Sequence, residues 1–199
     1  METIGGQRMM AAPVDDPLKS DSRSDQELIA ATNGGDSHAF EALYHRHRVW
    51  VVSLAYRFTG DRELALDVLQ ETFLYFIKKF PGFRLTAQLK TFFYPAVRNL
   101  SIAARRKAER FQQNENETGT IEAVLMTEPN VSPHESLTAA LAVLSAEHRE
   151  VLLLRFVDGL SLAEIAGALN IPLGTVKSRL HNALNTLRHN PRIKQYFEQ

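Results

Sequence analysis

A cluster of hydrogen-bonding and cationic side chains lies near the C-terminus, on one face of a segment that is expected to be helical. The cluster consists of Thr175, Lys177, Ser178, Arg179, His181 and Asn182, and it contains no carboxylate. Side chains of these types at the N-terminal end of a helix bind base edges and phosphates when the helix enters the major groove of DNA. The pattern therefore favours DNA binding over the alternative of an ordinary solvated helix face.

The residue types that most often carry out catalysis or bind metals are absent or unsuitably spaced. The 199-residue chain has no cysteine, which excludes disulfides, zinc–thiolate sites and a thiol nucleophile. Among its seven histidines, His45 and His47 are two positions apart and point to different sides of a helix, and no HExxH pattern occurs. The chain also has no P-loop, GxGxxG or GxSxG motif. We therefore expect no enzyme activity, no cofactor and no bound metal.

The basic cluster is positioned by a predicted helix-turn-helix. The sequence Ser161–Glu164 is a capping box that opens one helix, Asn170–Pro172 forms a tight turn, and a second helix begins near Leu173. The inward stripe expected on the second helix is Val176, Leu180, Leu184 and Leu187. A plain helical hairpin would show the same stripe, so the outward face, with no acid, is what favours DNA binding.

A second basic surface is predicted on a helix from about Thr86 to Phe111. At 100° per residue, its apolar stripe is Phe93, Val97, Leu100, Ala104 and Ala108. Another face carries Arg98, Asn99, Arg105 and Arg106, and the aromatic residues Phe83, Phe92 and Tyr94, together with Arg84, lie nearby. Phosphate neutralisation combined with aromatic stacking is typical of single-stranded DNA binding. For Phe92 and Tyr94, burial in the core is an equally good interpretation.

The net charge is zero, but the charged residues are segregated along the chain. Residues 90–110 carry six basic side chains and one acidic side chain, whereas residues 111–135 carry five carboxylates and no lysine or arginine. Residues 171–194 carry five basic side chains and no acid. This asymmetry creates local electrostatic fields that the total charge conceals.

The helix signals divide the chain into two small all-α domains. We expect an N-terminal extension (1–23), a helical domain (24–111), a flexible acidic linker (112–131), a second helical domain (132–190) and a tail (191–199). No apolar run is long enough to span a bilayer and no export signal is visible, so a cytoplasmic protein without membrane insertion is expected.

Three helices are predicted ahead of the second basic surface. One begins at a Ser24 capping box, one runs from Asp36 to about Phe58, and one from about Asp61 to Phe80. The apolar stripe of the third is Leu69, Phe73, Phe76, Ile77 and Phe80.

The segment Leu144–Arg188 resembles region four of bacterial sigma factors of the extracytoplasmic-function (ECF) group, and the run Gly174–Leu180 (GTVKSRL) is highly specific to them. The resemblance implies that the basic cluster reads the −35 promoter element and that the domain contacts the flap of the polymerase β subunit. The family usually has arginine at the positions of Asn182 and Leu184, which implies a shifted base preference.

The segment Asp61–Phe80 resembles the polymerase-binding helix of the same family through Asp67, Gln70, Glu71, Thr72 and Phe73. The resemblance implies that Asp67, Gln70 and Glu71 dock on the clamp helices of the β′ subunit. The next helix resembles the one that reads the −10 element, with Phe80–Ala87 as a loop that captures an unpaired base. The residues implied in −10 binding are Phe83, Arg84, Phe92, Tyr94, Arg98, Asn99, Arg105 and Arg106.

This second resemblance has three departures from the family pattern. Phe92 stands where the family usually has tryptophan, Ala103 stands where it usually has aspartate, and Pro95 lies inside the predicted helix. Proline removes a backbone donor, so a kink is expected there.

The sequence thus predicts an alternative sigma factor that assists DNA melting, with core RNA polymerase, promoter DNA and an anti-sigma factor as partners. Two alternatives remain open. One is a helix-turn-helix regulator that does not join polymerase, and the other is a sigma mimic that binds only a regulatory protein.

Overall fold

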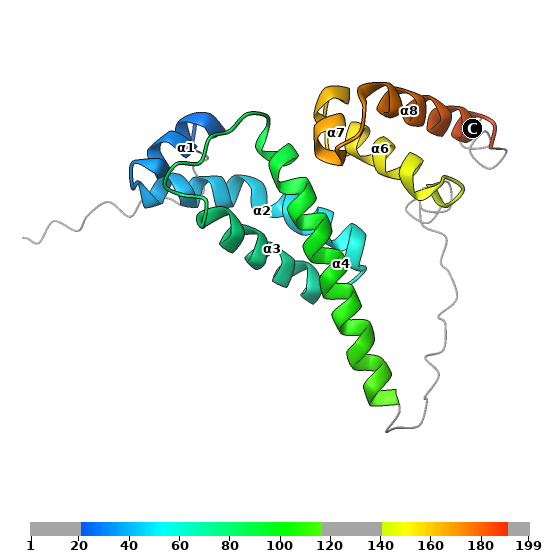
Figure 1. Cartoon of the computed structure of the whole chain (residues 1–199), viewed down its shortest axis with the longest axis horizontal. Coiled ribbons are helices and arrows are strands. Elements are labelled where there is room, and N and C mark those ends of the chain that lie inside the picture. Colours follow the sequence, from blue (N-terminus) through cyan, green and yellow to red (C-terminus); the bar gives the residue numbers. More distant parts are fainter. Residues whose placement is uncertain (1–20, 117–140, 191–199) are drawn as a thin grey trace, which may run out of the picture.

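The computed structural model describes residues 21–116 and 141–190, and all regular structure in these ranges is α-helical. The helices are α1 (Asp25–Asn33), α2 (Ser37–Thr59), α3 (Arg62–Ile77), α4 (Leu89–Asn116), α6 (Ala146–Phe156), α7 (Leu162–Leu169) and α8 (Leu173–Arg188) (Figure 1). The first four helices form an N-terminal unit and the last three form a C-terminal unit. None of these helices is long and apolar enough to cross a membrane.

Short polar side chains determine where the helices begin. Ser24 and Ser161 each accept a hydrogen bond from the backbone N–H of a glutamate three residues later, and that glutamate accepts one from the serine N–H. Asp36 caps α2 and Asp61 caps α3 in the same way, through the side chain alone. These bonds satisfy backbone donors that the helix itself leaves unpaired. The helix starts predicted at Ser24, Asp36 and Ser161 are confirmed.

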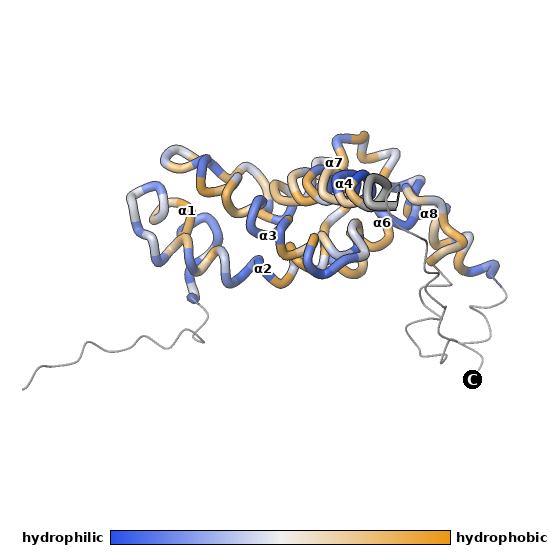
Figure 2. The backbone as a smooth tube through the Cα atoms, turned by 90° about the horizontal axis from the view of Figure 1, so that it is seen from below, coloured by the Kyte–Doolittle hydropathy of each residue, from blue (hydrophilic) through white to orange (hydrophobic). Residues whose placement is uncertain are grey.

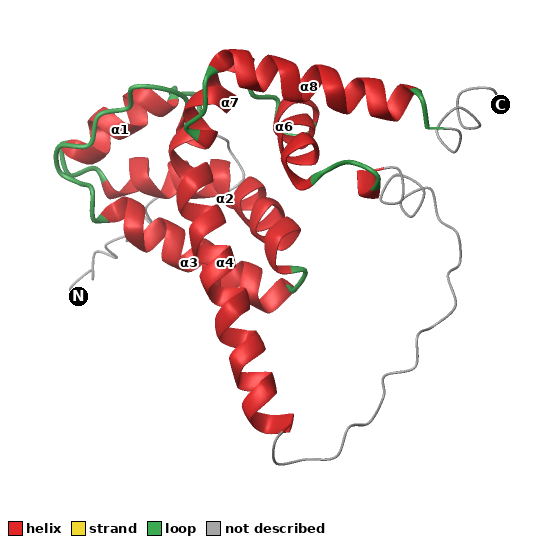
Figure 3. Ribbon diagram, turned by 45° about the vertical axis from the view of Figure 1, so that its right-hand side comes forward, coloured by secondary structure: helices red, strands yellow, loops and turns green. Residues whose placement is uncertain are grey.

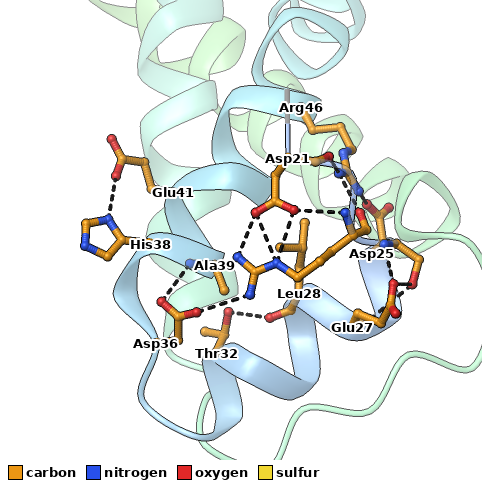
Figure 4. A network of polar contacts seen from close by, with 12 residues as sticks. Asp21, Asp25, Glu27, Leu28, Thr32, Asp36, His38, Ala39, Glu41 and Arg46 are labelled. Carbon is orange, nitrogen blue, oxygen red and sulfur yellow. Dashed lines mark hydrogen bonds and ion pairs between the residues drawn. The ribbon is translucent and has the colours of Figure 1, made fainter. Parts of the chain in front are cut away.

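A polar network fixes α1 against α2 (Figure 4). The carboxylate of Asp25 pairs with Nη1 of Arg46 at 2.6 Å and with Nε2 of His47 at 2.9 Å. Arg23, just before α1, pairs with the α2 cap residue Asp36 at 3.2 Å. These contacts link the chain entering α1 to both the start and the middle of α2.

The core of the N-terminal unit is built around the ring of Phe76 on α3, which is fully buried. Its centroid lies 5.7 Å from that of Phe40 on α2 and 5.0 Å from that of Phe93 on α4. Phe83, in the loop before α4, lies 5.2 Å away in an edge-to-face arrangement. Phe76 therefore joins α2, α3, α4 and the loop at one point.

The predicted apolar stripe of α3 is confirmed at Leu69, Phe73 and Phe76, which are buried. The prediction is wrong for Ile77, whose side chain is 47% exposed. At 100° per residue, position 77 lies roughly 70° from the centre of the buried stripe. Ile77 therefore faces outward, at the end of the helix.

The two units, which were expected as two domains joined by a linker, pack against each other and share one core. Buried residues of the C-terminal unit, including Val151, Leu154 and Ile165, belong to the same hydrophobic cluster as the N-terminal core. Helix α7 packs on α4 and on α8 (Figure 3). Figure 2 shows hydrophobic residues on the helices where the two units meet.

The inward stripe of α8 also differs by one residue from the prediction. Val176 and Ala183 are buried, whereas Leu184 is 39% exposed. Because the helix packs along the spacing 176, 180, 183, 187, the small side chain of Ala183 takes the place expected for Leu184.

Helix α4 begins later and ends later than predicted, and it continues as one helix through Pro95. Its last turn includes residues 112–116, which were assigned to the linker. The remainder of the predicted linker, the N-terminal extension before residue 21 and the C-terminal tail lie outside the described residues.

The central position of Phe76 leads to a stability prediction. We expect Phe76→Ala to lower the free energy of unfolding by about 3–5 kcal/mol, because it removes a fully buried ring and leaves a cavity. The neighbouring change Ile77→Ala should cost less than about 1 kcal/mol, because that side chain is half in solvent. Urea unfolding measured by circular dichroism tests both variants. Equal losses would show that Phe76 is not central to the core.

Candidate nucleic-acid interface

The N-terminal half of α8 presents its polar face to solvent. Lys177, Ser178, His181 and Asn182 are exposed, and Thr175 is partly exposed. The Ser178 hydroxyl donates to the backbone carbonyl of Thr175 at 3.0 Å, which leaves the oxygen of Ser178 free to accept. This face has the exposure and the donor groups that a recognition helix needs.

Arg179 behaves differently from the other residues of this cluster. Its Nη2 pairs with Oε2 of Glu147 on α6 at 2.8 Å, and its side chain is only 22% exposed, against 65% for Glu147. The pair joins α8 to α6 within the C-terminal unit. A base contact by Arg179 therefore competes with an existing ion pair.

Aromatic residues of α3, of the loop before α4 and of the first turn of α4 form a partly exposed surface over the core. The ring centroid of Phe92 lies 4.9 Å from that of Phe83 and 6.0 Å from that of Tyr75, with which it is stacked. Lys79 lies over the other ring of the stack, with Nζ 4.5 Å from the centroid of Tyr75. Arg84 is exposed beside Phe83. Tyr75 and Lys79 extend the predicted aromatic and basic surface.

Tyr94 and Arg98 are engaged by the C-terminal unit. Tyr94 is 1% exposed, and its hydroxyl donates a hydrogen bond to the carboxylate of Glu150 on α6. Burial and the bond to Glu150 raise the pKa of the Tyr94 hydroxyl well above its usual range. Nε of Arg98 bonds to the same carboxylate oxygen at 3.2 Å. In this arrangement, Tyr94 is a core residue and offers no ring surface to DNA.

The rest of the predicted α4 surface faces solvent. Asn99, Arg105 and Arg106 are exposed, and Arg105 pairs with Glu109 one turn later at 3.1 Å. That pair is exposed on both sides, so it is weak and is readily exchanged for a phosphate. Among the predicted residues of α4, Tyr94 and Arg98 therefore contact the C-terminal unit, whereas Asn99, Arg105 and Arg106 are open to solvent.

The polar face of α3 is confirmed as exposed at Asp67, Gln70 and Glu71. Sequence reasoning missed its apolar border, which consists of the exposed residues Leu66, Leu74 and Ile77. Asp67 and Glu71 also line a groove between α3 and α4, with Leu100 and Lys107 on the opposite side. A mixed face of carboxylates and exposed leucine is typical of a protein-docking surface.

Sequence reasoning also missed Glu150 and Asp158, two acids of the described part of the C-terminal unit that contact the N-terminal unit. The carboxylate of Asp158 accepts hydrogen bonds from Nε1 of Trp50 at 2.7 Å and from Nη2 of Arg57. The residues of the N-terminal unit that bond to these two acids are about 50 to 110 residues away from them in the sequence. Periodicity reports only local structure, so no signal in the sequence indicates these pairs.

The all-α fold and these surfaces define a helix-turn-helix protein with a second, larger helical unit. Residues 43–111 match the family model for Sigma-70 region 2, and residues 140–189 match that for Sigma-70, region 4. The chain belongs to the ECF group of RNA polymerase sigma factors.

Relatives of known identity span nearly the same length. The chain is 37% identical over 165 residues to the ECF RNA polymerase sigma factor SigL of Mycobacterium tuberculosis, covering 80% of this chain and 93% of SigL. It is 30% identical to the ECF sigma factor SigW of Bacillus subtilis, covering 82% of this chain and 94% of SigW. The sigma factor RpoE of Bartonella quintana, solved with the anti-sigma factor NepR, matches with a TM-score of 0.55 and 25% identity, covering 75% of this chain and 94% of that chain.

The Arg179–Glu147 pair leads to a prediction about base recognition. If Arg179 reads a base, Arg179→Ala should cost about 1–3 kcal/mol on the preferred duplex and relax the preference at one base pair. Glu147→Gln should have the opposite effect on affinity, because it releases the guanidinium. Selection from randomised duplexes, followed by binding titrations, measures both changes. An equal loss on every duplex would identify Arg179 as a phosphate contact.

Proposed function

We propose that this chain is an alternative sigma factor that binds core RNA polymerase and directs initiation at a specific set of promoters. The observation that carries the proposal is that one chain contains both matched regions, at nearly the full length of its ECF relatives. Sigma factors are non-enzymatic initiation factors, so the chain itself catalyses no reaction. It acts where the polymerase acts, in the cytoplasm.

The C-terminal unit is proposed to read the −35 element with the exposed face of α8. Lys177, Ser178 and Asn182 supply donors and acceptors for base edges, and His181 and Thr175 lie within the same face. The same unit is proposed to rest on the flap of the β subunit. Asn182 is well suited to an adenine edge, because an amide can donate to N7 and accept from N6.

The N-terminal unit is proposed to bind the melted −10 element. Phe83 and Phe92 offer partly exposed rings for stacking, and Arg84, Arg105 and Arg106 are placed to neutralise phosphates. Asn99 lies between these groups and supplies hydrogen bonds to an unpaired base. Holding separated bases on a protein surface assists melting, because it stabilises the open strand relative to the duplex.

The α3 face is proposed to dock on the clamp helices of the β′ subunit. Asp67, Gln70 and Glu71 form its polar centre, and Leu66 and Leu74 form an apolar border. This face distinguishes a sigma factor from a regulator that uses only a helix-turn-helix, because such a regulator needs no polymerase-docking surface of this kind. An anti-sigma protein is a further proposed partner, since RpoE, a sigma factor with the same fold, was solved with one.

Promoter-dependent transcription tests the proposed function directly. Adding the purified chain to core RNA polymerase should produce discrete run-off transcripts from a subset of genomic fragments that core polymerase alone does not transcribe. Transcription is measured by gel electrophoresis of labelled RNA. No gain on any fragment would contradict the proposal and favour a regulator or a sigma mimic.

Charge reversal on α3 tests the docking surface. Asp67→Lys and Glu71→Lys should each weaken binding to core polymerase by about tenfold or more, because each replaces a favourable charge with an unfavourable one at an interface. Glu41→Lys is the matched control, since Glu41 is an exposed acid on α2, outside this face. Competition for fluorescently labelled polymerase measures the affinities. Equal behaviour of all three variants would show that the α3 face is merely solvated.

A further inference from the structure

One aspartate of the C-terminal unit is held by two helices of the N-terminal unit. The side chain of Asp158, in the turn after α6, is only 2% exposed. Its Oδ1 accepts from Nε1 of Trp50 at 2.7 Å and its Oδ2 pairs with Nη2 of Arg57 at 2.7 Å, both on α2. Its backbone carbonyl accepts from Nζ of Lys90 on α4 at 3.0 Å. Burying this carboxylate is favourable only because charged and polar donors surround it.

A glutamate makes the second polar contact between the units. The carboxylate of Glu150 accepts a hydrogen bond from the hydroxyl of Tyr94 and pairs with Nε of Arg98. Both partners lie on α4, on the surface assigned to the −10 strand. The carboxylate of Glu150 therefore already pairs with the Arg98 guanidinium, the group that a DNA phosphate would also need, and it is bonded to the buried Tyr94 hydroxyl.

Apolar packing between the two units accompanies these two polar contacts. Helix α7 approaches α4 so closely that a Cβ added at Gly167 would lie 3.6 Å from Cγ2 of Thr91. Val151 and Leu154 of α6 are buried in the cluster shared with the N-terminal core. The arrangement in which the two units pack together, the closed arrangement, therefore contains a packed interface and not only an isolated pair of surface salt bridges.

The closed arrangement is incompatible with simultaneous contact to both promoter elements. Sites centred about 25 base pairs apart are separated by roughly 85 Å along B-form DNA, at 3.4 Å per base pair. Units of this size have radii of gyration of about 10–13 Å, so the centres of two units in contact lie only roughly 30 Å apart. The units must separate before α8 and α4 can each reach their element.

We propose that the free chain is autoinhibited by an interdomain latch, made of Asp158 with Trp50, Arg57 and Lys90, and of Glu150 with Tyr94 and Arg98. The proposal rests on the proposed function insofar as α4 is taken as the −10-binding helix. In the latch, Glu150 acts as an internal competitor of DNA for Arg98. Release of the latch exposes Tyr94 and frees Arg98 from its ion pair, and it lets the two units move apart on polymerase and promoter.

Removing the two latch carboxylates tests the proposal in the full chain. The double variant Asp158→Asn/Glu150→Gln keeps the shapes of both side chains and weakens their pairing with Arg57 and Arg98. The apparent affinity for DNA rises in proportion to the population of the open form. If the closed form of the parent is favoured about tenfold, the double variant should bind a labelled single-stranded oligonucleotide of mixed sequence about tenfold more tightly than the parent does. Trp50 is the sole tryptophan of the chain, so its emission should shift to longer wavelength as the latch opens.

The control for this variant must remove the same charge elsewhere. Glu41→Gln/Glu63→Gln removes two exposed acids outside the latch, and it should leave the Trp50 emission unchanged and alter DNA affinity far less. Equal affinities and equal Trp50 emission for the latch variant and the parent would overturn the proposal. So would an identical gain in affinity in the control variant.

A reversible crosslink provides an independent test, which the absence of native cysteines makes possible. Thr91→Cys and Gly167→Cys place two thiols across the closed interface, and the buried Thr91 hydroxyl has no hydrogen-bond partner in the described ranges to lose. A disulfide should form in the full chain, because the two side chains meet across the interface, with the Cβ position of residue 167 lying 3.6 Å from Cγ2 of Thr91. Circular dichroism should show an unchanged helical content in both redox states.

The oxidised protein should bind the labelled oligonucleotide at least about tenfold more weakly than the reduced protein, and reduction should restore binding. In each single-cysteine variant, neither oxidation nor reduction should change the affinity. Failure of the disulfide to form, or equal DNA binding in both redox states, would overturn the latch. Run-off transcription with core polymerase separates this outcome from failure of the proposed function. A reduced protein that binds DNA more tightly than the oxidised one, yet supports no transcription, would contradict the sigma function and leave the latch supported.

Discussion

Burial of the Asp158 carboxylate is the interaction on which the relative placement of the two helical units depends. A carboxylate loses most of its hydration when its side chain is 2% exposed, and it is stable there only if other groups replace the lost water. Trp50 and Arg57 of α2 supply those groups, and Lys90 of α4 donates to the backbone carbonyl of the same aspartate. Because all three donors come from the N-terminal unit, the polar requirement of Asp158 can be met only when the units pack together.

The aromatic cluster around Phe76 plays the corresponding part inside the N-terminal unit. Its ring contacts Phe83 and Phe92, which also form the partly exposed surface assigned to DNA binding. The rings of Phe83 and Phe92 thus pack against the core on one side and remain partly exposed to solvent on the other. Burial of Phe73 and Phe76 also fixes the rotation of α3, which turns Asp67 and Glu71 outward. One packing arrangement therefore orients both of the surfaces assigned to this unit.

The two faces that are proposed to bind DNA differ in how far they are exposed. The N-terminal half of α8 exposes its polar side chains, whereas the beginning of α4 is packed against α7 and is bonded to Glu150 of α6. Opposite charges are also arranged at this contact, since Glu150 and Asp158 face arginine and lysine. A chain with zero net charge can thus hold basic DNA-binding surfaces and still pack against itself.

By itself, the sequence determined the local structure of this protein and the family to which it belongs. The caps at Ser24, Asp36 and Ser161, the buried stripe of α3 and the polar face of α8 were all predictable, because each depends on residues within a few positions of one another. The motif Gly174–Leu180 and the Asp67–Phe73 pattern indicated the sigma family for the same reason.

Only the tertiary structure decided which of those residues are available. It showed that Tyr94 is buried against Glu150, that Arg179 is paired with Glu147, and that Ile77 and Leu184 face solvent. The docking of one unit on the other depends on contacts such as Arg57 with Asp158, whose partners are separated by 101 residues. Helical periodicity specifies which face of a helix is apolar, but it does not specify which other part of the chain packs on that face. The choice between a core residue and a DNA-binding residue on α4 was therefore made by long-range packing.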